Sequence, residues 1–289
     1  MLAGVKEAWL PLRSQWLDER VLLAFDDRTL QGVGLRKGGI GTPGWQSMLP
    51  AQALHNGMPE IVDVLGDFVG DLLLSQGLMG QPLRVALPPQ AAHWRVISWP
   101  FDEWPDDPIE ALLTIAPDLG LPFDLDRAAV DLQPLPGRPL RSLLVAAPVQ
   151  LVEAWIEAMA LAGLPLERLV PAQVCIREAL LPRLRGLDPR DAVVLLHPEA
   201  TGCSLQLWRQ TVPVYDAQLP LNGPELAAAV ETRLAYVQSR EPDFRPQQLW
   251  ISKPLPQQEA LADAIGLSLE LLDSAPYDSL VLQGLAQLP

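Results

Sequence analysis

Apolar residues follow two alternating patterns along this chain, and the order of the patterns repeats. Short apolar runs between turn residues predict strands, whereas apolar residues at every third or fourth position predict amphipathic helices. In the first unit the predicted strands are 21–26, 29–35, 45–49 and 83–87, with a helix at 59–76. In the second unit they are 192–197, 203–208, 212–217 and 248–252, with a helix at 224–239. This internal repeat predicts a duplicated architecture.

The helix of the second unit shows its pattern most clearly, because Leu226, Val230, Leu234 and Val237 all fall on one face. We expect that face to be buried. Only this one helix separates the third and fourth strands of the second unit, which predicts a small domain. The chain then ends with a predicted helix at 257–265, a strand at 268–272 and a helix at 276–286.

An additional segment separates the two units. Its predicted elements are strands at 94–99, 127–132 and 143–147 and helices at 108–116 and 149–162. The run at 142–147 is apolar without interruption, which favours a strand covered on both faces. Pro148 suits the first turn of the helix that follows. We therefore expect a strand–helix unit of a mixed sheet here, after which a helix at 172–184 returns to the first unit.

Residues 1–20 form an extension with a helical pattern of their own. One face collects large apolar residues, namely Leu2, Val5, Leu12, Trp9 and Trp16. Pro11 should kink or split this helix. Two interpretations stay open: a helix docked on its own domain, or one that binds a partner or a membrane interface.

Composition narrows the functional classes. The 289 residues include 21 Lys and Arg against 35 Asp and Glu, a formal charge of −14. So acidic a surface repels nucleic acid and anionic lipid. No uncharged apolar stretch is long enough to span a membrane, and the start lacks the basic-then-apolar order of a signal peptide. We expect a cytoplasmic protein whose Cys175 and Cys203 are buried thiols, with a disulfide between them as the less favoured alternative.

Three segments of the middle region resemble PilM-type proteins, the actin-like cytoplasmic components of type IV pilus assembly machines. They read LGLPFDLDRAAVDLQPL, SLLVAAPVQLVEAWIEAMALAGLPLERL and VPAQVCIREAL. The cytoplasmic domain of the type II secretion L protein is a more distant match. With gaps, the resemblance extends from about Val21 to the end. It implies an α/β protein with the actin-like ATPase fold, built from two duplicated halves with an inserted small α/β subdomain.

The same resemblance implies domain bounds and a partner. After the extension at 1–20, the first domain would comprise 21–93 and 171–187, the inserted subdomain 94–170 and the second domain 188–289. The partner would be a PilN-like inner-membrane protein, whose short cytoplasmic N-terminus would lie in a groove beside the inserted subdomain. Other pilus assembly components would join them. Such binding would hold the chain at the inner membrane without a membrane span of its own.

Actin-like ATPases hold phosphates on two strand turns, and the first of these is altered in this sequence. The family pattern at this turn is Asp-x-Gly followed by small hydroxyl residues, whose backbone N–H groups reach the phosphates. Aligning LQGVGL with the second strand puts Ala24 at the Asp position and Asp26 at the Gly position. Asp27, Arg28 and Thr29 then replace the hydroxyl run. An Asp in this place adds bulk and negative charge where phosphate should approach.

The second turn and the adenine region have changed as well. In VVLLHPEATGCSLQL, His197 stands at the family's Asp position and Glu199 at its Gly position, and Pro198 lacks an N–H. Only Thr201 and Gly202 keep a suitable shape. Farther on, Gly223 is the single glycine left of a usual pair, and Lys253 with Pro254 replaces the glycine pair expected under adenine.

These changes predict a degenerate nucleotide site. We expect a non-catalytic scaffold without cofactor, in which binding of ATP and Mg²⁺ is disfavoured. The alternatives are an ATP-binding switch of the same machine and a type II secretion L-like protein. A sugar kinase would need an Asp base and intact phosphate turns, which the sequence lacks. The three histidines have no zinc-ligand spacing, and GLRKGGIGTPG reads as a hairpin connection rather than a phosphate loop.

The segment 100–108 combines aromatic and acidic residues. One interpretation is a solvated loop that opens a helix, with Asp106 and Asp107 near the positive helix N-terminus. The other is a docking surface for a basic partner, in which Trp104 would be the anchor and the carboxylates would steer association.

Overall fold

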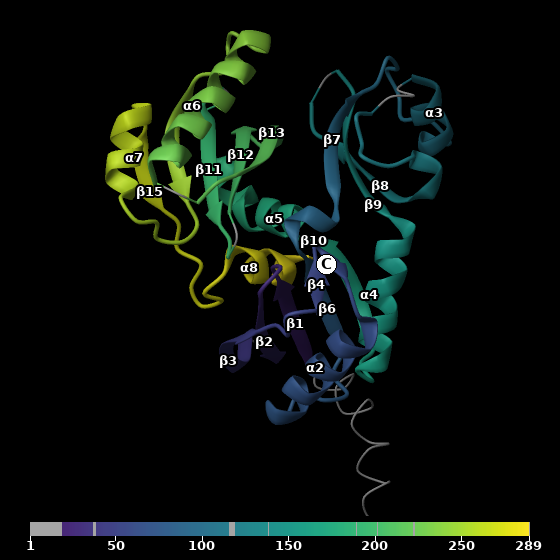
Figure 1. The fold of residues 1–289 in the computed structure, drawn as a ribbon. Coiled ribbons are helices and arrows are strands. Elements are labelled where there is room, and N and C mark those ends of the chain that lie inside the picture. The colour runs from purple at the N-terminus through teal and green to yellow at the C-terminus, as the bar shows by residue number, and fades with distance from the viewer. Residues whose placement is uncertain are drawn as a thin grey trace, which may run out of the picture.

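A computed structural model describes residues 19–36, 39–115, 119–137, 139–188, 190–200, 202–221 and 223–288. The predicted N-terminal helix lies outside these residues. Figure 1 shows three bodies: a first domain at the bottom, a second domain at the upper left and an inserted subdomain at the upper right. Among the described residues, no helix is both long and apolar enough to cross a membrane.

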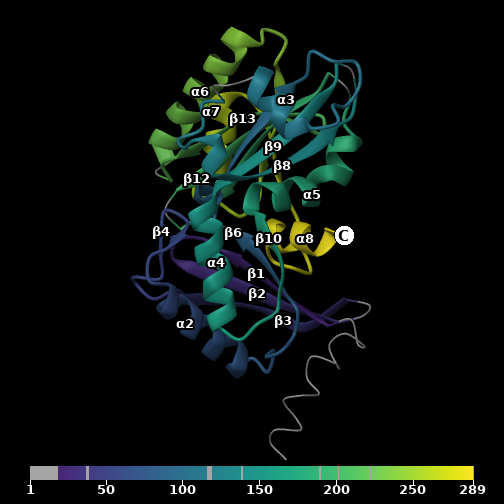
Figure 2. The same cartoon turned by 90° about the vertical axis from the view of Figure 1, so that its right-hand side faces the viewer.

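The first domain is a five-stranded mixed sheet with helices on both faces. Its strands are β1 (Arg20–Phe25), β2 (Thr29–Arg36), β3 (Gly39–Met48), β6 (Leu83–Leu87) and β10 (Leu166–Pro171), in the order β10-β6-β1-β2-β3. A small hairpin, β4 (Leu54–His55) and β5 (Met58–Pro59), precedes α2 (Val62–Ser75). The helices α2 and α4 (Val149–Leu161) pack on one face of this sheet, where Leu23, Leu65 and Trp155 are fully buried. Figure 2 shows α4 running along this domain.

The second domain repeats this arrangement. Its strands are β11 (Ala192–Pro198), β12 (Cys203–Arg209), β13 (Val212–Leu219), β14 (Pro246–Ile251) and β15 (Ser268–Leu271), in the order β13-β12-β11-β14-β15. The first three are antiparallel and the last two run parallel to β11, as β6 and β10 do beside β1. The helices α6 (Gly223–Arg240) and α7 (Gln258–Ile265) belong to this domain. The predicted duplication is therefore confirmed.

The predicted inward face of the second-domain helix is also confirmed. Leu226, Val230, Leu234 and Val237 of α6 are all buried, in one cluster with Leu249 and Phe244. Both cysteines are buried free thiols, as expected. Burial raises the pKa of the Cys203 thiol to about 12 and that of Cys175 above the range of a reactive thiol.

The inserted subdomain comprises β7 (His93–Ser98), α3 (Pro108–Ile115), β8 (Ala128–Leu135) and β9 (Arg141–Pro148), with short 3₁₀ turns at Pro89–Ala91 and Leu125–Arg127. Its sheet has the order β7-β9-β8. The central strand β9 is covered on both faces, as its apolar run predicts. All its pairings are antiparallel, however, so the expectation of a mixed sheet at this place is wrong.

Several predicted bounds need correction. The strand β10 pairs with β6 of the first domain, although residues 166–170 of it were expected within the inserted subdomain. Glu167 and Arg168 interrupt the apolar run there, which hides an edge strand from pattern analysis. Pro59 lies in β5, so the helix begins only at Val62, and β3 begins at Gly39 rather than near Trp45. The last helix, α8 (Leu280–Gln287), starts four residues later than 276.

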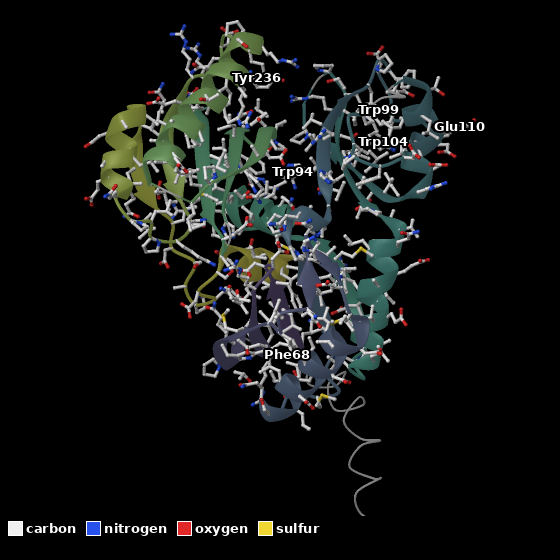
Figure 3. The ribbon with its side chains drawn as sticks, in the orientation of Figure 1. Phe68, Trp94, Trp99, Trp104, Glu110 and Tyr236 are labelled. Atoms are coloured by element: carbon white, nitrogen blue, oxygen red, sulfur yellow. The ribbon has the colours of Figure 1, made fainter. Side chains whose placement is uncertain are left out.

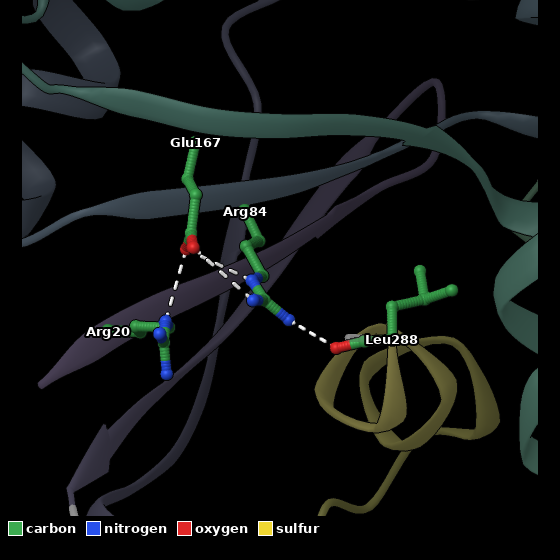
Figure 4. Close-up of polar contacts among 4 residues, drawn as sticks. All are labelled: Arg20, Arg84, Glu167 and Leu288. Carbon is green, nitrogen blue, oxygen red and sulfur yellow. Dashed lines mark hydrogen bonds and ion pairs between the residues drawn. The ribbon is translucent and has the colours of Figure 1, made fainter. Parts of the chain in front are cut away.

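The helices α5 (Ala172–Arg185) and α8 lie between the two domains, where they pack on both sheets. Gly284 allows their close contact, since a Cβ there would lie 1.7 Å from the Cys175 carbonyl oxygen. Figure 4 shows how the end of α8 is attached to the first sheet. The buried Arg84 of β6 donates to Glu167 at 3.0 Å and to the Leu288 carbonyl at 2.6 Å, and Arg20 of β1 donates to the same carboxylate at 3.1 Å.

Candidate functional site

The first strand turn is closed by its own carboxylate. Asp26 follows β1, and its Oδ1 accepts hydrogen bonds from the backbone N–H groups of Arg28 at 2.8 Å and Thr29 at 2.6 Å. Its Oδ2 accepts a third bond from the Thr29 hydroxyl at 2.8 Å. Backbone N–H groups in such a turn are the donors that an actin-like ATPase offers to phosphate. In this chain two of these donors are already hydrogen-bonded to the Asp26 carboxylate.

Neighbouring Asp27 holds a different backbone donor. Its Oδ1 accepts the N–H of Gly57 at 3.0 Å, from the loop between β4 and β5. Ala24, which the sequence alignment puts at the aspartate position, is buried in β1 and has no polar side-chain group. The acidic side chains of this turn, Asp26 and Asp27, are both hydrogen-bonded within the protein.

The second turn, which follows β11, also has polar groups that are hydrogen-bonded within the protein. His197, at the end of β11, is buried, and its Nδ1 lies 2.7 Å from the Ser252 hydroxyl oxygen. Pro198 has no N–H to offer. The N–H of Glu199 donates to the Gly202 carbonyl at 2.9 Å, so this donor too is used within the turn. Thr201 lies outside the described residues, and of Gly223 the structure gives only its place as the first residue of α6.

The structure brings most of the predicted positions together around one small cavity. Its volume is about 30 Å³, roughly the space of one water molecule. Ligand sites of proteins usually enclose about 300–1,000 Å³. The predicted positions that line the cavity are Ala24, Asp26, Thr29, His197, Glu199 and Lys253. Asp27 is not among the lining residues, although its charge acts on Glu199.

Charges inside this cavity oppose an anionic ligand. Burial raises the pKa of Glu199 to about 7. The hydrogen bond from Gln218 opposes this shift, whereas the negative charges of Asp26 and Asp27 add to it. Burial, with a smaller repulsion from Lys253, lowers the pKa of His197 to about 3, so its ring is neutral. Burial also lowers the pKa of Lys253, while Asp26 and Glu199 oppose that shift. One lysine thus faces carboxylates from both turns, and a triphosphate would add further negative charge to them.

We tested whether the residues present fit Mg-ATP, the ligand that the predicted fold implies, and they do not. The turn donors are bound internally, the cavity has room for about one water molecule, and the facing side chains are acidic. A hydroxyl and an imidazole, Ser252 and His197, occupy the place of the second catalytic turn. Polar residues from both domains, Asp26, Glu199 and Lys253, thus meet around this cavity.

Some lining residues escaped the sequence analysis. Pro89 and Ala172 line the cavity beside Ser279 and Val281 from the start of α8. The internal repeat of the two domains is the signal that could have revealed them. In each domain a helix follows the last strand of the sheet, α5 after β10 and α8 after β15, and both helices begin at the interface between the domains.

The acidic segment before α3 lies in the inserted subdomain, away from this cavity (Figure 3). Trp104 is half-buried, with its ring 5.4 Å from that of Trp99 in an edge-to-face arrangement. Asp107 Oδ1 accepts the N–H of Glu110 at 2.9 Å, which is the helix-opening role of the first interpretation. Asp106 is exposed, as are the apolar residues Phe101, Ile109 and Leu113 around it.

The chain can now be compared with known proteins. No protein-family model matches the chain, and no curated protein sequence matches it. Among solved structures, the chain is similar to one in the PilM-PilN type IV pilus biogenesis complex, with a TM-score of 0.69, 19% identity and coverage of 92% of this chain and 97% of that one.

Two further structures share the architecture. A Bacteroides thetaiotaomicron protein with an actin-like ATPase fold and unknown function has a TM-score of 0.57 and 8% identity, over 96% of this chain and 98% of that chain. The cytoplasmic domain of EpsL, an inner-membrane component of the type II secretion system of Vibrio cholerae, has a TM-score of 0.53 and 11% identity, over 93% of both chains.

The chain has the actin-like ATPase fold, as the resemblance implied. Its two duplicated halves, the inserted subdomain and the matches over nearly the whole length agree on this. Within that fold, the PilM-PilN chain gives a higher TM-score than the other two structures described here.

Proposed function

We propose that the chain is a non-catalytic scaffold of a type IV pilus or competence-pilus assembly machine, at the cytoplasmic side of the inner membrane. The observation that carries this proposal is the similarity in fold to a chain of the PilM-PilN complex over 92% of the length. The filled nucleotide cavity supports the non-catalytic part, since attachment needs no open site between the domains.

The proposal includes a loss of ATP binding. The Asp26 carboxylate occupies the donors of the first turn, and a bound triphosphate would have to displace it and separate the two domains. Isothermal titration of the folded chain with Mg-ATP should therefore give no measurable heat of binding. Low-micromolar affinity in that titration, or an ATP-dependent rise in melting temperature, would instead favour the ATP-binding switch.

For the partner, we propose the short cytoplasmic N-terminus of a PilN-like inner-membrane protein, bound to the inserted subdomain. A hollow of about 440 Å³ is present there, and Arg95 and Ser98 are its polar lining residues. The rest of its lining is apolar and comes from β7 and the segments around α3: Val96, Ile97, Pro100, Ile115 and Leu119. The segment that follows Pro100 and Phe101 contains four acidic residues, Asp102, Glu103, Asp106 and Asp107. Cytoplasmic segments beside membrane spans are rich in Lys and Arg, so an apolar hollow with an acidic rim is complementary to one.

The residues that would carry this contact are exposed or half-buried. Phe101 is 42% exposed, Ile109 38% and Leu113 49%, and together with Trp104 they give the acidic rim an apolar centre. Trp104 is the proposed anchor, and Asp106 is free of the capping role that Asp107 has. Peptide binding at this place would hold the chain at the membrane.

The test uses a labelled peptide with the N-terminal sequence of the single-span membrane protein encoded beside this chain's gene. Fluorescence anisotropy should report binding, and Trp104→Ala combined with Asp106→Asn should weaken it at least about tenfold. Leu74→Ala is the matched control, because Leu74 is a 66% exposed apolar residue on α2 of the first domain. If the variant with both substitutions binds the peptide with unchanged affinity, the proposed docking surface is wrong.

A type II secretion L-like role is the second candidate. The observation in its favour is the similarity to the EpsL cytoplasmic domain over 93% of both chains. The nearby genes discriminate between the two: a separate single-span protein supports the pilus machine, whereas continuation of this chain into a membrane segment supports the secretion machine.

A further inference from the structure

A wide hollow lies between the inserted subdomain and the second domain. Its volume is about 730 Å³. One wall is the sheet face formed by β7 and β9, and the other is β13 with the last turn of α6. Figure 3 shows Trp94 low between the two bodies and Tyr236 on α6 above it. We name it the arginine cleft, after Arg95, Arg141, Arg209 and Arg240, which line it.

The charge of this cleft is opposite to that of the chain. Four arginines line it against two acidic residues, Asp216 and Glu241, whereas the whole chain has a formal charge of −14. One of these acids is already engaged within the protein: Asp216 interacts with Arg95 and accepts a hydrogen bond from the Trp94 side chain. In a protein this acidic, a concentration of arginine marks a site for a negatively charged group.

Two guanidinium nitrogens in the cleft lack a hydrogen-bond acceptor. Arg141 Nε and Arg209 Nη2 are both buried as atoms and have no hydrogen-bond partner among the described residues. Arg209 Nη2 does have an ion pair with Glu241, but at 3.5 Å that contact is long for a hydrogen bond. Buried donors are almost always satisfied in native proteins. Both side chains are half-buried, so a small rotation of each guanidinium group would present its nitrogen to an acceptor from a partner.

The wall of the cleft also offers a strand edge. β7 is an outer strand of its sheet, and the N–H of Trp99 just beyond it donates to Leu140 on the β9 side. Because backbone groups alternate in direction along an antiparallel strand, those of Val96 and Ser98 point away from β9. Val96 and Ser98 both line the cleft. An extended segment can therefore pair with this edge while its side chains reach the arginines.

We propose that the arginine cleft binds an acidic, extended segment of a second partner protein. This inference does not rest on the proposed function, because the charge of the cleft is opposite to that of the acidic rim proposed for the membrane partner. The cleft and the hollow of that partner do share Arg95, Val96 and Ser98 of β7. The segment would add to the edge of β7, and its carboxylates would accept from Arg141 and Arg209. A long polyanion such as nucleic acid would also meet the acidic surface outside the cleft, whereas a short acidic segment meets only the local positive field.

The test uses labelled synthetic peptides with the full chain. In one peptide Glu alternates with Thr, and in the matched peptides Gln or Lys replaces every Glu. Anisotropy should give an affinity for the Glu peptide at least about tenfold higher than for the Gln peptide, and this difference should shrink as salt rises. The Lys peptide should not bind.

Substitutions then locate the binding. Arg240→Gln and Arg141→Gln should each weaken the Glu peptide several-fold, whereas Arg233→Gln, an exposed arginine of α6 that does not line the cleft, should leave it unchanged. Glu241→Gln should strengthen binding, since it removes a competing acid and releases Arg209. This gain keeps the test decisive even if Arg141→Gln does not fold.

Three results would overturn the proposal. The first is equal affinity for the Glu and Gln peptides. The second is an equal loss in Arg233→Gln and Arg240→Gln. The third is binding of inorganic pyrophosphate, reduced by Arg240→Gln, without binding of any acidic peptide, which would assign the cleft to small phosphorylated ligands.

Discussion

The Asp26 carboxylate and the Thr29 residue are joined twice, through the backbone N–H at 2.6 Å and through the hydroxyl group at 2.8 Å. The same carboxylate accepts from the N–H of Arg28. It therefore uses backbone N–H groups that a phosphate would need if this turn held one. The turn is organised without a ligand, and the donors that would attract one are already satisfied.

The Asp26→Ala variant should lower the free energy of unfolding by about 1–2 kcal/mol. The change leaves the N–H groups of Arg28 and Thr29 without their acceptor inside a partly buried turn. Urea denaturation followed by circular dichroism measures this loss. Mg-ATP should still not bind, because Glu199 and Lys253 continue to fill the cavity.

Asp26→Asn is the control for this substitution. Its side-chain oxygen can still accept both N–H bonds, so the unfolding free energy should fall by less than in Asp26→Ala. If the two substitutions lower the free energy of unfolding equally, the hydrogen bonds of Asp26 are not what stabilises the turn.

Glu199 should make the protein less stable as pH rises. Burial raises the pKa of its carboxyl from about 4.5 to about 7, so the folded state holds a proton that the unfolded chain has lost in this pH range. Stability must then fall between about pH 4.5 and 7. In Glu199→Gln this loss should disappear, which would raise stability at pH 8 by about 1–2 kcal/mol relative to the parent.

The stability of the protein depends on pH through His197 as well, and this dependence has the opposite sign to that of Glu199. Burial lowers the pKa of His197 to about 3, so the unfolded chain takes up a proton that the folded state excludes as pH falls below about 6.5. Acidification therefore destabilises through His197 and stabilises through Glu199. Denaturation of Glu199→Gln across pH 4–8 should show a loss of stability on acidification to which His197 and His93 both contribute, because burial also lowers the pKa of His93. A profile identical to the parent contradicts the assignment to Glu199.

Gly284→Ala should severely destabilise the chain. Its new Cβ would lie 1.7 Å from the Cys175 carbonyl oxygen, so α5 and α8 would have to separate within the core between the domains. Overpacking of this kind costs about 3 kcal/mol. Differential scanning calorimetry measures the effect, and Gln287→Ala on an exposed position of the same helix should be neutral. A melting temperature within error of the parent contradicts the close approach.

Arg84→Lys should weaken the attachment of α8. The guanidinium joins Glu167 on β10 to the Leu288 carbonyl, and an ammonium group cannot reproduce both contacts with the same geometry. We expect a loss of about 1–3 kcal/mol and faster hydrogen exchange in α8. Arg20→Lys, at a more exposed position, should cost less than about 1 kcal/mol. Equal costs for the two variants contradict the role of Arg84.

Most of the fold could be predicted because its apolar patterns are strong and occur twice. The strand at 83–87 is apolar except for Arg84, residues 192–196 are an uninterrupted apolar run, and α6 has regular apolar spacing. β10 could not be predicted in this way, because Glu167 and Arg168 lie on the outer edge of the sheet, where tertiary contacts rather than local pattern define a strand. The hairpin of β4 and β5 consists of two-residue strands, too short for any periodicity.

The candidate site could be predicted by position but not by geometry. The alignment named Asp26, His197, Glu199 and Lys253, which do meet around one cavity. It could not show that Asp26 satisfies its own turn or that Ser252 contacts His197, because both depend on side-chain direction. The arginine cleft could not be predicted, since its four arginines are far apart in the sequence and lie together only because the inserted subdomain packs beside the second domain.

The position of α8 has a consequence for how this chain matures. Residues 280–288 complete a core shared with Leu22 of the first strand and Val193 of the second domain. During synthesis, the first sheet must therefore wait, with one apolar face uncovered, until nearly the whole polypeptide has left the ribosome. Such a nascent chain is a natural substrate for chaperones, and a stop codon before residue 280 would yield an aggregating product rather than a smaller working protein.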